Sequence, residues 1–240
     1  MTNIVVLNSQ IHRALRVQPG ASAQHGDKQR FVPVIISEFP LLAVHCPILL
    51  SKDAETGAFY CGAMLGFDAG ENLFLDEGNR YDAYRPLNLQ RGPFYTAGDD
   101  LAIDLDSSRI DAAAGELLFG DAGDPTPYLQ SIMALMRELR PGLERTKIFI
   151  ETLMKLKLVV SLNLNVGFDD GTKRDVTGLY TIDKDVLRGL PDATVLDLFR
   201  RGYLHLIYLL IASVNQVAVL AQKKNQRFLR ESGALTGSAR

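Results

Sequence analysis

The pattern of apolar and polar residues changes character about halfway along the chain. In the first half, short apolar runs such as 31–36, 59–65 and 101–105 are separated by Gly, Pro, Asp and Asn, which is typical of strands closed by turns. In the second half, apolar residues recur every three or four positions, as in amphipathic helices. The chain is therefore expected to be an α+β protein, with a strand-rich N-terminal half and a helical C-terminal half that contains one β-hairpin.

The helical half has recognisable start and stop signals. Thr126 is placed to cap a helix that begins at Pro127 and carries apolar residues at helical spacing. We expect Pro141-Gly142 to end this helix, because proline lacks the N–H that a helix interior needs. A second helix should follow, and Asp183 should cap a short helix further on.

The hairpin is predicted for residues 161–182. Leu162, Leu164 and Val166 alternate with polar residues, which indicates a strand with one buried face. Asp170-Gly171 supplies a tight turn, and residues 175–182 return as the partner strand.

The length of 240 residues suits one domain with a full core. We expect a single domain over 1–231, with lobes at 1–120 and 121–231, because strands give way to helices near Asp121. Residues 232–240 are small and polar and are expected to form a disordered tail.

The C-terminal segment Leu204 to Ala221 is largely apolar and is flanked by basic pairs, which is the outline of a short membrane span. Polar residues interrupt it, so a buried or interface-forming helix is favoured and no span is expected. Its apolar residues recur at spacings of three and four, which predicts a homodimer formed through this helix. These residues are Leu206, Leu209, Leu210, Val214, Val217 and Leu220.

Charge and cysteine content exclude several classes of protein. A formal net charge of -2 and a pI near 6.1 disfavour binding to nucleic acid, which needs clustered Lys and Arg. Cys46 and Cys61 lack the spacing of metal ligands and are expected to be buried, reduced thiols. The N-terminus lacks the features of a signal peptide, so we expect a cytoplasmic location.

A series of short segments, taken in order and spacing, resembles the bacterial SapC family. The resemblance covers nearly the whole chain and implies a link to surface-layer and outer-membrane nutrient-uptake loci. It implies no agreed catalytic residues and no cofactor. The segments are His12 to Arg16, Glu38-Phe39-Pro40, Leu65-Gly66-Phe67, Glu71-Asn72-Leu73-Phe74, Pro127-Tyr128-Leu129-Gln130, Glu144-Arg145-Thr146 and Gly178-Leu179-Tyr180.

No standard catalytic motif is present. The serine-hydrolase elbow, the zinc-protease helix, the phosphate-binding loop and the dinucleotide fingerprint are all missing from the sequence. Asp104 and Asp106 could offer oxygen ligands to a divalent cation, but a solvated acidic edge is the favoured interpretation, and no metal site is predicted. A non-enzymatic role is therefore favoured, with no catalytic residue assigned.

The leading hypothesis is an accessory or binding protein that recognises a peptide, protein or glycan-derived ligand. Basic residues near the N-terminus suit a carboxylate or phosphate. Acidic residues beside apolar neighbours lie where burial can raise the pKa of a carboxyl toward a general-acid role. The predicted ligand-binding residues are His12, Arg16, Glu38, Glu71, Asn72 and Tyr180. The alternative is an enzyme of unrecognised type that uses Glu38, Glu71 and His12 in a shared cleft.

Overall fold

The computed structural model describes residues 3–111 and 113–237, with side chains through residue 230. The chain forms two compact units, and each unit is built from two chain segments. Unit 1 consists of residues 1–28 and 75–144, and unit 2 consists of residues 29–74 and 145–240. The division at residues 28, 74 and 144 differs from the predicted lobe boundary, and the single domain over 1–231 stays a prediction.

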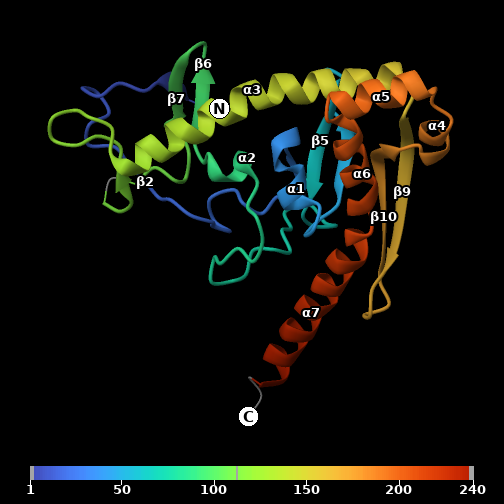
Figure 1. Cartoon of the computed structure of the whole chain (residues 1–240). Helices are drawn as coiled ribbons and strands as arrows, with labels where there is room; N and C mark the ends of the chain where they lie inside the picture. The colour runs from blue at the N-terminus through green and yellow to red at the C-terminus, as the bar shows by residue number, and fades with distance from the viewer. Residues whose placement is uncertain (1–2, 112, 238–240) are drawn as a thin grey trace. The chain divides into compact units, whose positions relative to one another are not determined.

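Unit 1 contains a small antiparallel sheet. Its strand order is β1-β7-β6, formed by Ile4–Val6, Asp100–Asp104 and Phe94–Ala97 (Figure 1). A two-stranded ladder joins β2 (Arg16–Val17) to β8 (Glu116–Leu117), and the short helix α2 spans Leu87–Gln90. The long helix α3 (Pro127–Lys155) begins in this unit, where its buried stripe includes Leu129, Ile132 and Leu139.

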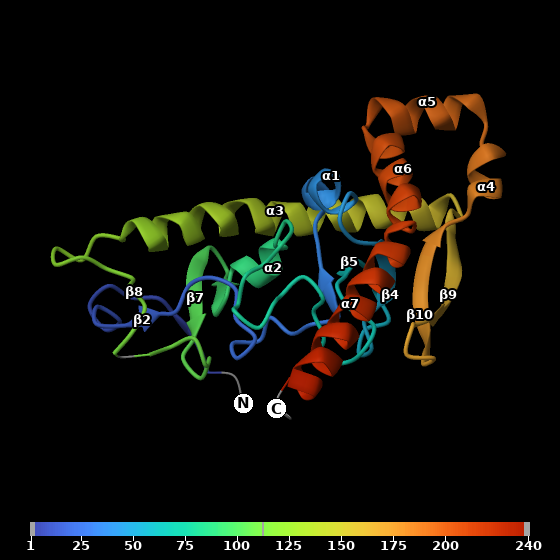
Figure 2. The same cartoon turned by 90° about the horizontal axis from the view of Figure 1, so that it is seen from below.

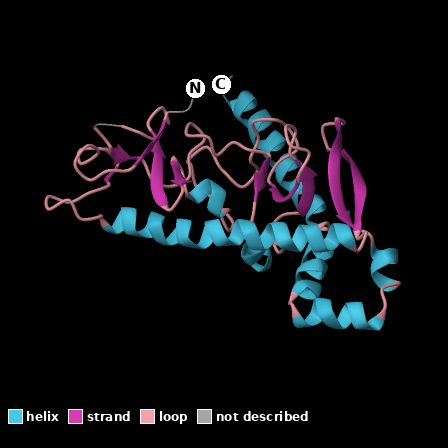
Figure 3. Ribbon diagram, turned by 90° about the horizontal axis from the view of Figure 1, so that it is seen from above, coloured by secondary structure: helices cyan, strands magenta, loops and turns pink. Residues whose placement is uncertain are grey.

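Unit 2 is built on a five-stranded antiparallel sheet with the order β3-β5-β4-β10-β9. The strands are Phe31–Pro33, Phe59–Met64, Ile48–Lys52, Lys173–Ile182 and Val159–Gly167. The last two form the long hairpin that Figure 3 shows in magenta. Its two strands pair from Lys173–Gly167 to Ile182–Val159, with a register shift between Val176 and Leu179.

Helices cover one part of this sheet. They are η1 (Ile36–Glu38), α1 (Phe39–Leu42), α4 (Lys184–Arg188), α5 (Asp192–Arg200), α6 (Tyr203–Ser213) and α7 (Gln216–Gly237). Helix α6 packs against α1, α5, β4 and β10, and α7 continues from its end (Figure 2). A hydrogen bond of 2.9 Å from the Ile48 N–H to the Ser213 hydroxyl fixes α6 to β4.

The α+β fold class and the hairpin are confirmed. Two predicted caps are also confirmed, because the Thr126 hydroxyl accepts a bond from the Leu129 N–H and the Asp183 carboxylate accepts bonds from the Asp185 and Val186 N–H groups. Each of these features depends on neighbouring residues, which is why the sequence pattern predicts it.

The expected break at Pro141-Gly142 was wrong, because α3 is continuous from Pro127 to Lys155. Proline fixes a backbone angle that a helix accepts, and the loss is limited to one hydrogen bond and a local clash. Burial of Leu139 before the proline and of Phe149 and Leu153 after it holds the helix on both sides. Tertiary packing therefore overrides the local helix-breaking signal.

Two residues of the predicted dimer face are buried, and the homodimer stays a prediction. Leu210 and Leu220 are fully buried within unit 2, so they belong to its core and not to an exposed face. Helix α7 runs to Gly237, so residues 232–237 of the predicted tail lie in this helix, and residues 238–240 lie outside the described part of the chain.

Candidate functional site

The predicted ligand residues of unit 1 bond to nearby backbone groups. His12 Nδ1 accepts a hydrogen bond of 3.0 Å from the Asn8 N–H, and the His12 N–H donates back to the Asn8 carbonyl. Arg16 lies in β2 and donates through Nη1 to the Gly115 carbonyl at 2.9 Å. Both side chains therefore have local partners that shape the backbone around β2.

The predicted residues of unit 2 also have local partners. Glu38 is buried, and its carboxylate accepts a bond of 2.9 Å from the Ile35 N–H, which caps the start of η1. The Asn72 side-chain oxygen accepts from the Phe74 N–H, and the Tyr180 ring packs edge-on against Phe59 at 4.9 Å. The structure brings Glu71 and Asn72 into one loop. The ligand-binding role of all six residues stays a prediction.

Glu71 belongs to a cluster of charges that fixes α7 to the loop after β5. Lys224, on α7, has a side chain only 8% exposed. Its ammonium group donates to Asp68 Oδ2 at 2.7 Å and to Glu71 Oε1. Arg174, on β10, reaches Asp68 Oδ1 at 2.7 Å, so two cations face two carboxylates. We call these four residues the Lys224 clamp.

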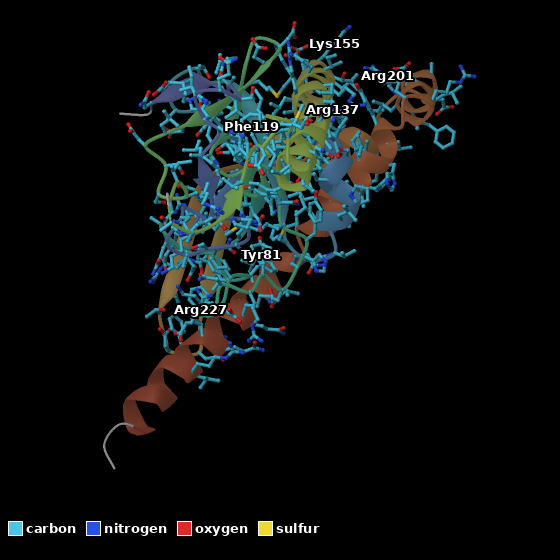
Figure 4. All side chains as sticks on the ribbon, turned by 90° about the vertical axis from the view of Figure 1, so that its left-hand side faces the viewer. Tyr81, Phe119, Arg137, Lys155, Arg201 and Arg227 are labelled. Atoms are coloured by element: carbon cyan, nitrogen blue, oxygen red, sulfur yellow. The ribbon has the colours of Figure 1, made fainter. Side chains whose placement is uncertain are left out.

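The rest of the loop supports the clamp. The Glu71 carboxylate also accepts a bond from the Phe67 N–H at 2.8 Å, and Arg227, labelled in Figure 4, donates to the Asn72 carbonyl. The ring of Phe168 lies 5.1 Å from Phe67 and 6.1 Å from Phe228, both edge-on. Glu71 and Asn72 therefore hold the loop and α7 together, which is a structural use of the acidic segment.

The clamp shifts the pKa of its members. Hydrogen bonds from Arg174 and Lys224 lower the pKa of Asp68 below its ordinary value of 3.8. Burial alone would lower the pKa of the Lys224 ammonium, but its bonds to Asp68 and Glu71 outweigh burial and raise that pKa. Lys224 is therefore a fixed cation and not a neutral base.

These shifts predict how acid affects unit 2. A carboxyl whose pKa is lowered by folding stabilises the fold above its unfolded pKa and loses this contribution as pH falls through the folded pKa. Near neutral pH, Asp68→Asn should lower the free energy of unfolding by about 1 kcal/mol, since Asp68 is partly exposed. Below about pH 4 the difference between wild type and variant should shrink. Urea unfolding at a series of pH values measures this, and a constant difference would contradict it.

Unit 1 contains a second charged cluster, in which the positive charges outnumber the negative ones. Asp27 Oδ2 accepts bonds from Arg85 Nη2 at 2.9 Å, from Arg109 Nη2 at 3.0 Å and from the Ser22 N–H at 2.7 Å. Asp27 and Arg109 are almost fully buried. Two guanidinium groups thus share one carboxylate, which leaves a positive charge in a region of low solvent access.

The two arginines have different surroundings. Arg109 also donates through Nη1 to the carbonyls of Gln18 and Gly20, so both of its terminal nitrogens have partners. Within the described part of the chain, Arg85 donates only through Nη2, to Asp27 and to the Leu89 carbonyl. Its Nε is buried and has no hydrogen-bond partner among the described residues. Burial lowers the pKa of the Arg85 guanidinium, and the charge of Asp27 opposes this effect.

Arg85 lines a pocket of about 370 Å³ in unit 1. Apart from Arg85, the lining residues come from helices α2 and α3 and include both polar and apolar side chains. The other lining residues are Leu87 and Gln90 from α2, and Tyr128, Ser131, Ile132, Ala134, Leu135 and Glu138 from α3.

Tyr128 is a neutral phenol in this pocket. Burial raises the pKa of Tyr128 to about 12, although the positive charges of Arg109 and Arg85 oppose the rise. Its ring packs edge-on against Phe94 at 6.3 Å. A neutral hydroxyl beside a guanidinium can donate a hydrogen bond to an anion, as the guanidinium itself does.

Sequence reasoning missed both clusters. Lys224 follows Leu220 by four positions on the buried side of α7, and a lysine in such an apolar stripe is a usable signal for a buried ion pair. Asp27, Arg85 and Arg109 lie far apart in the sequence and share no periodicity, so the pattern of residues carries no signal for them.

The remaining candidates have structural roles. The Asp104 carboxylate accepts bonds from the Asn3 and Asp106 N–H groups, which stabilises a turn. Among the described residues, no group of three or more His, Cys, Asp or Glu side chains could hold a metal ion. Cys46 and Cys61 are free and buried, as predicted, and burial raises the pKa of each thiol to about 12.

Comparison with known proteins defines the class to which this chain belongs. The model of the SapC family matches residues 7–220. This is most of the 240 residues, so the chain belongs to the SapC family. No curated protein and no solved structure matches the chain.

Proposed function

We propose that this member of the SapC family is a non-enzymatic accessory protein that binds a small carboxylate-bearing ligand in the pocket beside Arg85. The observation that carries the proposal is the incomplete hydrogen bonding of a largely buried arginine on the pocket wall. The Arg85 side chain is 15% exposed, so part of it is accessible to a ligand.

The number of donors supports this proposal. A guanidinium has five N–H donors, and Arg85 makes its two hydrogen bonds through Nη2 alone. The Nη1 group has no hydrogen-bond partner among the described residues, so a carboxylate in the pocket can accept a bond from it. Carboxylates match the planar geometry of arginine and can accept two parallel bonds.

The balance of charge supports an anionic ligand. Asp27 can neutralise only one of the two arginines that contact it, and one carboxylate would neutralise the other. The carboxylate of Glu138 also lines the pocket and would repel a second negative charge. A ligand with one negative charge is therefore favoured over a dianion.

The rest of the lining describes the body of the ligand. Leu87, Ile132 and Leu135 offer apolar walls, while Tyr128 and Ser131 offer hydroxyl groups. A pocket of about 370 Å³ lies at the small end of ligand sites and suits a metabolite or a single terminal group. Peptides and acidic glycan-derived molecules both carry such a group, and either could supply it.

We further propose that the protein acts in the bacterial cytoplasm, in a pathway associated with surface-layer or outer-membrane uptake functions. The two free thiols support a reducing compartment, because disulfides persist mainly in oxidising ones. Cell fractionation with an antibody to the native protein tests the location, and recovery only from the cell exterior would contradict it.

The ligand proposal predicts a specific response to carboxylates. Hexanoate, an N-acetylated amino acid and glucuronate represent apolar, peptide-like and sugar acids, and each is paired with its uncharged amide. We expect at least one acid to raise the unfolding temperature while its amide does not, because a ligand that binds only the folded state stabilises it. Equal responses to acid and amide would contradict a role for Arg85.

Two tryptophan variants test the pocket itself. Ala134 lines the pocket, and Ala134→Trp should fill it and weaken acid binding about tenfold or more, measured by calorimetry. Met133 is 37% exposed, lies on the same helix and is not a lining residue, so Met133→Trp is the matched control. Since the native chain has no Trp, fluorescence of each variant also reports folding. Equal affinities in the two variants would place the ligand elsewhere.

A further inference from the structure

We infer that unit 2 docks onto the surface of an anionic lipid bilayer through an apolar surface formed by helices α1 and α6. We call it the α1–α6 surface and define it by Leu41, Val44, Leu204, Tyr208 and Ile211. This interaction is independent of the pocket in unit 1.

The first observation is an apolar helix that its own unit covers only in part. Among the described residues, Tyr203–Arg230 is one stretch that could cross a membrane by length and composition, and 22% of its most apolar window is buried. Ile207, Leu210 and Ser213 are the buried positions of α6. They lie on the side that packs against β4 and β10.

The opposite side of α6 exposes apolar residues. Tyr208 is 57% exposed, and Leu204 and Ile211 are half-buried at spacings of four and three from it. Helix α1 packs against α6, as Figures 1 and 2 show, and contributes Leu41, while Val44 lies in the turn after α1. Leu41 is 50% exposed and Val44 is 64% exposed. Phe39, which precedes them, and Leu42, which lies between them, are buried. Large apolar residues that share neighbouring helices in this way mark an interaction surface.

The second observation is the charge around this surface. From Leu198 to Arg230 the chain has no acidic residue, whereas it has two arginines before α6 and four cations within α7. Lys224 is neutralised by the clamp, and Arg201 pairs with Asp197 at 3.5 Å. Arg200 and Arg230 are exposed and can meet phosphates. Apolar residues between basic groups are typical of helices that lie in a membrane interface.

Charge also decides between a bilayer and a second copy of the chain. A parallel dimer through α6 would place Arg200 and Arg201 of one copy near the same residues of the other. An anionic bilayer instead supplies phosphate groups, and each basic residue near such a surface favours binding. A full span is disfavoured, because the Ser213 bond to β4 and the buried Leu210 hold α6 on its own sheet.

Vesicle sedimentation tests this inference with the full-length protein. We expect the protein to pellet with vesicles of phosphatidylglycerol and phosphatidylethanolamine but not with phosphatidylcholine alone, and added salt should reduce binding. A protein that pellets with neither type, or equally with both in high salt, would overturn the inference.

Substitutions locate the surface. Val44→Glu and Tyr208→Glu should each weaken binding to anionic vesicles about tenfold, because each places a negative charge against the lipid. Ile148 is 48% exposed on α3 and lies outside the surface, so Ile148→Glu is the control and should bind like wild type. Circular dichroism confirms folding of each variant, and Val44→Ala and Tyr208→Ala repeat the test without added charge.

Three results would assign the surface differently and overturn the inference. Equal binding by all variants would place lipid contact elsewhere in the chain. A dimer mass in light scattering that Tyr208→Glu converts to a monomer would assign the surface to a second copy. Release of the protein from membranes only by detergent, and not by salt, would indicate a span.

Discussion

Lys224→Met is expected to lower the free energy of unfolding of unit 2 by about 3–5 kcal/mol. The substitution keeps most of the volume but removes the cation that faces Asp68 and Glu71. The Glu71 side chain is 9% exposed, so its carboxylate would lose its main partner while remaining largely shielded from water. Chemical denaturation followed by circular dichroism measures the change.

The control for this prediction is the same substitution at an exposed lysine. Lys155 lies at the end of α3, as Figure 4 shows, and Lys155→Met should change stability by less than about 0.5 kcal/mol. Adding Glu71→Gln to Lys224→Met should restore part of the loss, because it removes the unpaired charge. If Lys224→Met matched Lys155→Met, the clamp would contribute nothing to folding.

The segment Glu71-Asn72-Leu73-Phe74 illustrates how a family feature can be structural. Acidic residues beside apolar ones suggest a general acid, and the sequence alone leaves that hypothesis open. In unit 2, Glu71 accepts bonds from two loop N–H groups and from Lys224, and Leu73 and Phe74 are buried. These contacts account for each residue of the segment without a substrate.

Local features of the fold could be predicted from the sequence because their causes are local. The hairpin follows from alternation in residues 161–168 and from the Asp170-Gly171 turn, where Gly171 has a positive φ of 82°. The caps at Thr126 and Asp183 depend on residues two or three positions away. Such short-range signals do not require knowledge of which strands pair.

Non-local features could not be predicted. Strand β4 pairs with β5 and also with β10, which is more than a hundred residues away in the chain. The buried state of Leu210 and the continuity of α3 across Pro141 both depend on tertiary packing. The pattern of residues on an apolar helix face is the same whether the sheet of its own unit, a partner protein or a membrane covers that face.

The candidate site could not be predicted either, because its residues are far apart in the sequence. Arg85 and Arg109 resemble ordinary surface arginines in the sequence, and only the fold brings both to Asp27. The residues that the sequence favoured, such as Glu38 and His12, instead have short-range bonds that shape turns and caps. Polar residues at element boundaries are easily mistaken for ligand residues, because capping and binding use the same side chains.

Asp27→Asn is expected to destabilise unit 1 by about 3–5 kcal/mol, because it leaves Arg85 and Arg109 without a counter-charge. The amide can keep a bond to one arginine but cannot attract both. If the pocket binds a carboxylate as proposed, saturating ligand should stabilise Asp27→Asn at least as strongly as wild type, since the ligand would then supply a negative charge in place of the one that Asp27 loses. Thermal unfolding with and without the acid measures both effects.

A matched control lies in the same unit. Asp99 pairs with Arg140 at 2.6 Å, but both side chains are largely exposed, with fractions of 95% and 54%. Asp99→Asn makes the same chemical change at a solvent-exposed site and should lower the free energy of unfolding by less than about 1 kcal/mol. A large loss for Asp27→Asn beside a small one for Asp99→Asn would show that burial sets the energy of the cluster. If both substitutions lowered the free energy of unfolding by the same small amount, solvent would already neutralise the excess positive charge. The case for an anionic ligand at Arg85 would then fail.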